Sequence, residues 1–198
     1  MSKKIEDIGT ADRALDEAQR LTQERGFNAF SYADIAQELG VSKAALHYHF
    51  ASKATLGEAL ITRYRHRFEI ALAEISAKGL GVREQLEAYV ELFANVLVAD
   101  RMCLCGMLAA EQQTLPDGMQ RGVLKFFAEN ETWLESVLNT GNSDGDLKYA
   151  GSAIDRARML LGGLEGAMLI ARSHNDVERF RASAAMLLRQ FEGQSIST

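Results

Sequence analysis

The segment from Ser42 to Lys53 carries side chains that suit contact with nucleic acid. It holds two lysines, two histidines and Tyr48, and no acidic residue. A lysine ammonium group can neutralise a phosphate, and tyrosine and histidine can donate hydrogen bonds to phosphate oxygens. Small Ala44 and Ala45 would let a helix approach the major groove closely and contact a thymine methyl group. The segment therefore predicts chemistry suited to a DNA duplex.

The charge of the chain is unevenly divided. Its formal net charge is −5, which by itself would oppose nucleic-acid binding. Residues 1–67, however, hold ten basic and nine acidic side chains, whereas the remainder holds twelve basic and eighteen acidic ones. Arg63, Arg65 and Arg67 add basic charge one helical stretch beyond Lys53. The basic footprint is mild and confined to the N-terminal third.

Two short helices are needed to position these side chains. Ser31 is a good N-cap for the first, which would end at Gly40, and Ser42 is a good N-cap for the second, Lys43 to His49. Gly40 can adopt the positive φ angle of a sharp turn, and Val41 can fill the angle between the helices. The spacing predicts a helix-turn-helix, although a Gly-Val-Ser turn also joins helices in ordinary bundles.

The rest of the chain reads as helical. Its single proline, at position 116, leaves nearly the whole sequence free of the strongest helix breaker, so we predict an all-α fold. We expect a first helix capped by Thr10 and ending at Gly26, a fourth from Ser52 to about 78, and a loop over 141–146. The later helices are expected at about 82–99, 105–113, 116–140, 152–172 and 176–191.

Composition restricts the class of protein. Hydrophobic residues make up 47% and charged residues 25%, as in ordinary globular chains. There is no apolar run of the roughly 18 residues that a membrane span needs, and the N-terminus has no apolar signal segment. Two cysteines in one C-x-C pair do not make a secreted disulfide framework. We therefore expect a cytoplasmic protein with no membrane partner.

From Thr10 to Leu60 the sequence resembles the DNA-binding domain of the TetR family of transcriptional regulators. Three segments carry the resemblance: residues 26–31 (GFNAFS), residues 34–36 (DIA) and residues 40–53 (GVSKAALHYHFASK). The resemblance implies a three-helix helix-turn-helix domain at 1–55, followed by a larger helical ligand-binding and dimerisation domain at 56–198. It also implies binding to double-stranded, palindromic operator DNA.

The resemblance assigns roles to individual residues. The sequence departs from the family in having His47 where tyrosine is frequent, which leaves the base preference open, and Ala54 where glutamate is frequent. The positions that meet the DNA backbone in the family are Ser31, Ser42, Lys43, Tyr48, His49 and Lys53, and those that meet bases are Ala44, Ala45 and His47.

The last two helices are expected to join two copies of the chain, as they do in the family. Dimerisation also has a physical reason, since one recognition helix reads only a short half-site. The alternative is that both faces simply close the monomer core. The apolar residues on these faces are Ile154, Ala157, Leu161, Leu164, Met168 and Ala171, then Phe180, Ala184, Leu187, Leu188 and Phe191.

A pocket for a small-molecule effector is expected among the middle helices. Glu111 on the sixth helix could meet a polar or cationic ligand group, or could be a solvated helix charge. The candidate apolar lining, most of which could equally be plain core, is Tyr89, Phe93, Met102, Met107, Phe126, Phe127, Trp133 and Met159.

Cys103 and Cys105 suggest an alternative signal. They lie at the start of the sixth helix, where the helix dipole favours a thiolate, so a thiol-based sensor of electrophiles or oxidants is conceivable on the same scaffold. Free cysteines are more often small buried hydrophobes. A zinc site is disfavoured, because two cysteines without further ligands do not complete a tetrahedral set.

Other classes of function find little support. No histidine has the Glu-x-x-His spacing of a di-metal bundle, and no nucleophile elbow, P-loop or dinucleotide fingerprint occurs. We therefore expect no enzymatic activity, no cofactor and no metal. A helical ligand-binding protein without DNA contact is a remote alternative. The sequence predicts a ligand-responsive regulator, a repressor that a small-molecule inducer releases from its operator.

Overall fold

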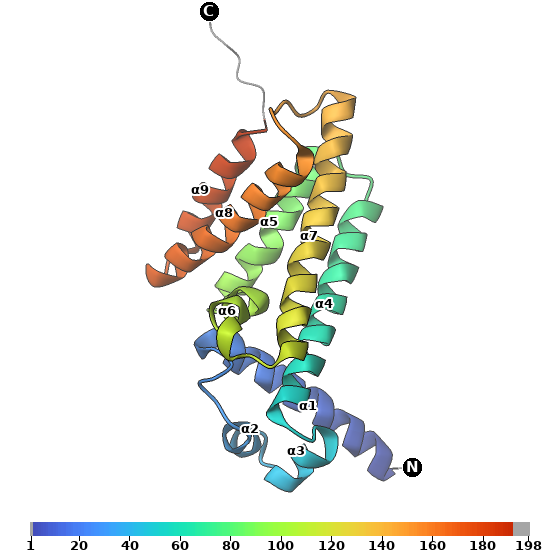
Figure 1. The fold of residues 1–198 in the computed structure, drawn as a ribbon, viewed down its shortest axis with the longest axis vertical. Coiled ribbons are helices and arrows are strands. Elements are labelled where there is room, and N and C mark those ends of the chain that lie inside the picture. Colours follow the sequence, from blue (N-terminus) through green and yellow to red (C-terminus); the bar gives the residue numbers. More distant parts are fainter. Residues whose placement is uncertain (1, 192–198) are drawn as a thin grey trace, which may run out of the picture. The chain divides into compact units, whose positions relative to one another are not determined.

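The computed structural model describes the backbone of residues 2–191 and the side chains of residues 9–191. Within this range it contains nine α-helices, one 3-10 turn and no strand, so the all-α prediction is confirmed (Figure 1). The elements are α1 (Ser2–Arg25), α2 (Tyr32–Leu39), α3 (Lys43–His49), α4 (Lys53–Ala77), α5 (Val82–Val98), α6 (Leu104–Ala110), η1 (Gln112–Thr114), α7 (Asp117–Asp144), α8 (Ala153–Ser173) and α9 (Val177–Arg189).

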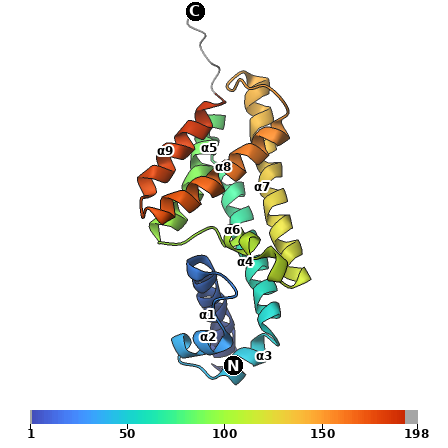
Figure 2. The same cartoon turned by 60° about the vertical axis from the view of Figure 1, so that its left-hand side comes forward.

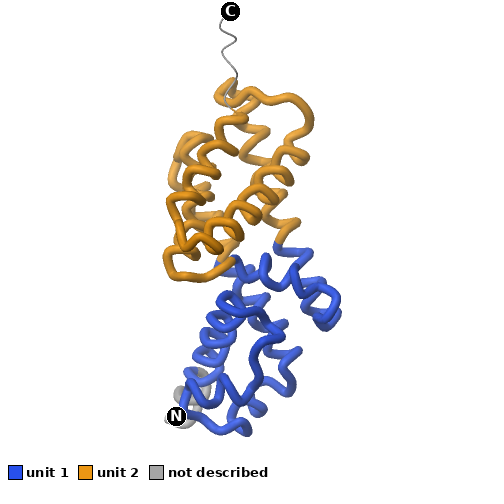
Figure 3. The backbone as a smooth tube through the Cα atoms, turned by 90° about the vertical axis from the view of Figure 1, so that its left-hand side faces the viewer, with its two compact units in different colours: residues 1–67, 103–126 blue, residues 68–102, 127–198 orange. Residues whose placement is uncertain are grey.

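The chain folds into two compact units, coloured separately in Figure 3. Unit 1 comprises residues 1–67 and 103–126, and unit 2 comprises residues 68–102 and 127–198. The segment 103–126, which holds α6, η1 and the start of α7, therefore packs with the N-terminal helices although it follows them by many residues. A functional division near residue 55 stays a prediction.

Unit 1 is built on the apolar face of α1. Ala14, Ala18 and Leu21 recur at helical spacing and are buried, as are Ile35 of α2 and Leu46 of α3, which pack with α1. The helix begins well before Thr10, so the predicted cap is wrong. A threonine can cap a helix but does not force one to start, and residues 2–9 contain no proline to interrupt the hydrogen bonding.

Unit 2 contains the antiparallel pair α8 and α9 packed on α5, visible in Figures 1 and 2. The face of α8 formed by Ala157, Leu161, Leu164 and Met168 is buried within this unit. Phe180 and Ala184 of α9 are buried in the same way. The faces of α8 and α9 that were expected to join two copies are therefore largely buried within this unit, as the alternative of a closed monomer core predicts, and dimerisation through these helices stays a prediction.

The C-terminal end of α7 also differs from expectation. The helix continues to Asp144 through most of the segment predicted as a loop, and the backbone turns at Gly145, which has a φ of 83°. Gly141 lies within the helix, and its lack of a side chain allows neighbouring residues to pack closely against it. An added methyl group would lie 2.7 Å from both Leu147 and Val82. The glycine that suggested a loop is thus required by tertiary contact.

Among the described residues, none of the helices combines the length and the apolar character that a bilayer crossing requires.

Candidate nucleic-acid interface

The N-terminus of α2 is held by a reciprocal capping box. Ser31 Oγ accepts a hydrogen bond from the Ala33 N–H at 3.1 Å, and the Asp34 carboxylate accepts from the Ser31 N–H at 2.6 Å and from its hydroxyl at 2.8 Å. These bonds hold the pKa of Asp34 below its ordinary value. The start of α2 is therefore set by local sequence, as the serine cap predicted.

The turn between α2 and α3 depends on Gly40. This residue has φ 65° and ψ 31°, the left-handed conformation that glycine adopts without a steric penalty. The Val41 N–H donates to the Ala36 carbonyl at 3.0 Å, which closes the Schellman-type end of α2. Arg13 of α1 donates to the Leu39 carbonyl at 3.1 Å, a contact that the sequence did not suggest.

The helix α3 is anchored from its inner side. Ser42 Oγ accepts from the Ala45 N–H at 3.1 Å, and Leu46 is only 1% exposed. The buried hydroxyl of Tyr32 donates to the Phe50 carbonyl at 2.9 Å, tying α2 to the end of α3, and burial raises the pKa of Tyr32 to about 12. These contacts fix which side of α3 faces outward.

The outward face of α3 is formed by Lys43, Ala44, His47 and Tyr48, which we call the recognition face. All four are exposed, and Tyr48 is 76% exposed. They lie one above another because residues three and four apart share a helix face. This surface offers an ammonium group, an imidazole, a phenol and a methyl group on a helix narrow enough for a major groove.

The recognition face is partly preorganised. The His47 ring lies edge-on to Tyr32, with centroids 4.7 Å apart, and its Nδ1 lies 3.4 Å from the Ala51 carbonyl. A proton on Nδ1 for this contact would leave Nε2 as a hydrogen-bond acceptor. Tyr48 packs edge-on against His49, which is half-buried, as is Ala45. Of the residues predicted on α3, Ala45 and His49 therefore lie at the margin of the exposed surface.

Lys53 takes a different position from the one expected. Its ammonium group turns inward, donates to the carbonyls of Phe27 and Phe30, and lies 4.4 and 4.3 Å from the centroids of their rings. The residue is half-buried rather than spread on the surface. Lys53 therefore has partners within unit 1, and its predicted contact with the DNA backbone stays a prediction.

The arginines of α4 also have protein partners. Arg63 pairs with Asp16 of α1 at 2.8 Å, and Arg67 pairs with the same carboxylate at 3.6 Å. The Arg63 side chain is only 15% exposed. The basic charge at these positions serves the α1–α4 contact, so the positive footprint is narrower than the sequence count indicated.

Glu111 contacts the loop that follows α1 in unit 1. Its carboxylate accepts hydrogen bonds from the backbone N–H groups of Phe27, at 2.9 Å, and Asn28, at 3.2 Å. Asn28 in turn donates through its side chain to Thr114 Oγ1 at 2.7 Å. The structure thus gives Glu111 protein partners instead of the ligand group considered from the sequence, and Asn28 and Thr114 were not foreseen.

The predicted pocket residues fall into three groups. Tyr89, Phe93 and Trp133 form an aromatic cluster in unit 2: Tyr89 and Trp133 are stacked 5.4 Å apart, and Tyr89 and Phe93 lie 5.3 Å apart. The Tyr89 hydroxyl donates to buried Asn130 at 2.9 Å. Met102 is also buried in unit 2, whereas Phe126 and Met107 belong to unit 1. Met159 is 42% exposed on the outer side of α8, separate from the cluster.

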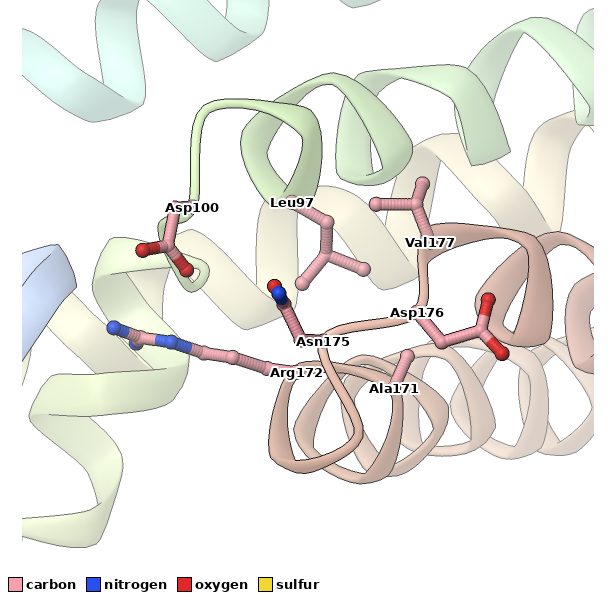
Figure 4. Close-up of a pocket in the computed structure, with 7 residues that line it drawn as sticks. All are labelled: Leu97, Asp100, Ala171, Arg172, Asn175, Asp176 and Val177. Atoms are coloured by element: carbon pink, nitrogen blue, oxygen red, sulfur yellow. The ribbon is translucent and has the colours of Figure 1, made fainter.

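A shallow hollow opens at the α8–α9 turn of unit 2. Figure 4 shows that both polar and apolar side chains line it. None of the predicted ligand residues lines it. The lining residues are Leu97, Asp100, Ala171, Arg172, Asn175, Asp176 and Val177.

Cys103 and Cys105 are both buried, and the Tyr64 hydroxyl lies 4.0 Å from Cys103 Sγ. Redox-sensing thiols combine thiolate character with access to the reagent. The thiol-sensor alternative therefore lacks the exposure that it needs. Among the side chains that the structure describes, no group of three or more histidine, cysteine or acidic residues is arranged to hold a metal ion.

A capped helix, a left-handed glycine turn and a second helix with an exposed polar face define a helix-turn-helix DNA-binding protein. The comparisons agree: residues 14–60 match the family described as "Bacterial regulatory proteins, tetR family". The chain belongs to the TetR family of transcriptional regulators. This membership also weighs against the alternative of a ligand-binding protein without DNA contact.

Three relatives illustrate the similarity. The HTH-type transcriptional repressor KstR2 of Rhodococcus jostii is 34% identical over 145 residues, 71% of this chain and 69% of that protein. The HTH-type transcriptional repressor ComR of Escherichia coli is 27% identical over 90% of this chain and 87% of its own length. A TetR-family regulator from Agrobacterium tumefaciens superimposes with a TM-score of 0.90 at 34% identity, covering 93% of this chain and 98% of that one.

Proposed function

We propose that this regulator is a repressor that binds a palindromic operator as a homodimer and is released by a small-molecule effector. The observation that carries the proposal is the recognition face of α3, which is exposed, partly preorganised and free of acidic side chains. Two relatives, ComR and KstR2, are named as transcriptional repressors. Repression by steric occupation of an operator needs only DNA binding and release.

The residues of the recognition face fall into two groups, those suited to contact phosphates and those suited to contact base edges. Lys43 at the start of α3 is suited to a phosphate, and the Tyr48 phenol to a phosphate oxygen. Ala44 and His47 are suited to base edges, Ala44 through methyl contact with thymine and His47 through a hydrogen bond. Substitution of His47 should change the preferred bases, whereas substitution of Lys43 should weaken binding to all sequences alike.

The operator can be found by selecting bound sequences from random duplexes, followed by titration at several salt concentrations. Phosphate contacts predict a linear fall of the logarithm of affinity with the logarithm of salt concentration. Lys43→Gln should reduce the slope by about one, while His47→Ala should leave the slope unchanged and alter the selected sequence. A chain that binds no duplex at low ionic strength would refute the proposal.

Dimerisation is supported by a surface on α8 opposite its buried face. Met159, Gly162, Gly166, Leu169 and Ile170 share this side, which we call the outer stripe of α8. Leu169 is 59% exposed, and Met186 of α9 is 60% exposed. A methyl group added at Gly162 or Gly166 would meet no atom within 4 Å, so both glycines leave space for a second backbone. Exposed apolar surface of this kind marks an interaction site.

The dimer can be tested by placing charge on the outer stripe. Gly166→Glu and Leu169→Glu should leave the helical signal unchanged, because both positions are open to solvent in the single chain. Sedimentation should then report a monomer, and binding to the palindrome should fall. Asn139→Glu, at an exposed site on α7, is the matched control and should remain dimeric. Retention of the dimer by both stripe variants would exclude this interface.

The effector is proposed to act by population shift: a ligand that binds one conformation of the helical bundle better than another changes the spacing of the two recognition helices. The aromatic cluster of Tyr89, Phe93 and Trp133, with its buried Tyr89–Asn130 hydrogen bond, favours an effector with an apolar or aromatic body and one polar group. Compounds that dissociate the operator complex should also change the fluorescence of Trp133. Dissociation without any response at Trp133 would place the effector elsewhere.

A further inference from the structure

The loop of residues 26–30 is held from two opposite sides by charged groups. It joins α1 to the Ser31 cap of α2, so its position determines how α2 enters the helix-turn-helix. Gly26 begins the loop with a φ of 94°, and the rings of Phe27 and Phe30 meet edge-on with centroids 5.6 Å apart. Both phenylalanines are buried, whereas Asn28 and Ala29 are exposed.

On the N–H side, the Glu111 carboxylate accepts from the backbone amides of Phe27 and Asn28. A carboxylate that binds two successive amides is a charge-assisted contact, stronger than a neutral hydrogen bond. The fit is close: a methyl group added at Gly26 would lie 2.5 Å from Glu111 Oε1. The Asn28–Thr114 hydrogen bond of 2.7 Å fastens the same loop to η1.

On the C=O side, the Lys53 ammonium group donates to the carbonyls of Phe27 and Phe30 and lies over both rings. Burial lowers the pKa of Lys53, and the negative charge of Glu111 opposes that shift. The two charges therefore stabilise each other across the loop that separates them. Peptide N–H and C=O groups, together with two aromatic faces, fill the space between.

We propose that Glu111 and Lys53 are positioning residues that grip loop 26–30 as a two-sided clamp and thereby set the affinity for DNA without touching it. The proposal rests on the DNA-binding function and adds to it a role for Lys53 of α4 and for Glu111, which lies between α6 and η1. Lys53 then acts through the α1–α2 loop rather than through a phosphate. The clamp ties the end of α6, within the same unit, to the beginning of α2.

The direction in which substitution of Glu111 changes the DNA affinity distinguishes the clamp from a purely electrostatic effect. Removing a negative charge should raise affinity for a polyanion if charge alone matters. Under the clamp, Glu111→Gln lowers affinity instead, by about tenfold, because one charge-assisted acceptor is lost and Lys53 loses its counter-charge. Asp117→Asn, an exposed carboxylate in the same unit, is the matched control and should leave affinity unchanged or slightly higher.

The salt slope separates the two roles of Lys53. Lys53→Met keeps the aliphatic stem and should lower DNA affinity with the slope of the wild-type chain, because no phosphate contact is lost. Lys43→Gln supplies the comparison, with a slope reduced by about one. The double variant Glu111→Gln/Lys53→Met should lose much less than the two single losses combined, since both side chains hold one loop.

Hydrogen exchange at the Phe27 and Asn28 amides gives a readout independent of DNA. Both amides should exchange faster in Glu111→Gln than in the wild-type chain and in Asp117→Asn. A reduced salt slope for Lys53→Met, a gain of affinity for Glu111→Gln, or unchanged exchange in that variant would each overturn the clamp. If Lys53→Met does not fold, the proposal is tested by the DNA affinity and the amide hydrogen exchange of Glu111→Gln. A wild-type chain that binds no DNA would instead refute the proposed function.

Discussion

Gly40 provides the sharpest test of the helix-turn-helix geometry, because its conformational and packing contributions can be separated. Its φ of 65° and ψ of 31° lie in the left-handed region, and an added methyl group would meet no atom within 4 Å. The cost of Gly40→Ala is therefore conformational alone, about 1–2 kcal/mol. Gly40→Asn should cost less, since asparagine adopts this conformation more readily.

The cost is measurable by urea unfolding, with all variants at the same protein concentration because the apparent stability of a chain that associates depends on its concentration. With a dependence of about 1–3 kcal/mol per molar urea, the midpoint of Gly40→Ala should fall by roughly 0.3–2 M. Gly9→Ala is the matched control: it lies within α1 with open space around it, so alanine should stabilise the chain by up to about 1 kcal/mol. The reasoning is refuted if Gly40→Ala is as stable as the wild-type chain, or if Asn costs more than Ala.

Three further predictions concern single contacts. Tyr32→Phe leaves the Phe50 carbonyl without its donor and should lower the free energy of unfolding by about 1–2 kcal/mol; an unchanged urea midpoint would contradict the α2–α3 tie. Asp34 has a pKa below its ordinary value when folded, so its stabilising effect is present at neutral pH and is lost as the pH falls through that lowered value. Asp34→Asn should remove this part of the fall in the free energy of unfolding at acid pH. If both proteins lose stability identically as the pH falls, the capping box contributes nothing. Gly163→Ala should destabilise the chain where Gly9→Ala does not, because the methyl group at position 163 would lie 2.8 Å from Leu187; equal thermal midpoints for the two variants would mean that α9 moves aside without cost.

Much of the helix-turn-helix could be predicted because its signals are local. Ser31 and Ser42 cap the helices that follow them, and Gly40 turns the chain between them, through bonds that reach no more than five residues. Periodicity likewise placed α2, α3, α5 and α8 to within one or two residues. These interactions depend on neighbours in the sequence, so the sequence alone contains the information.

Other features depend on residues that are distant in the chain. Lys53 was expected to meet phosphate, yet it binds carbonyls more than twenty residues away, and Glu111 binds amides more than eighty residues away. The helical pattern of α8 showed an apolar face but not whether a second copy or the chain's own α5 and α9 would cover it. A side chain's type and spacing define what it can bind, whereas the fold decides which group comes within hydrogen-bonding distance, since that depends on how separated helices pack.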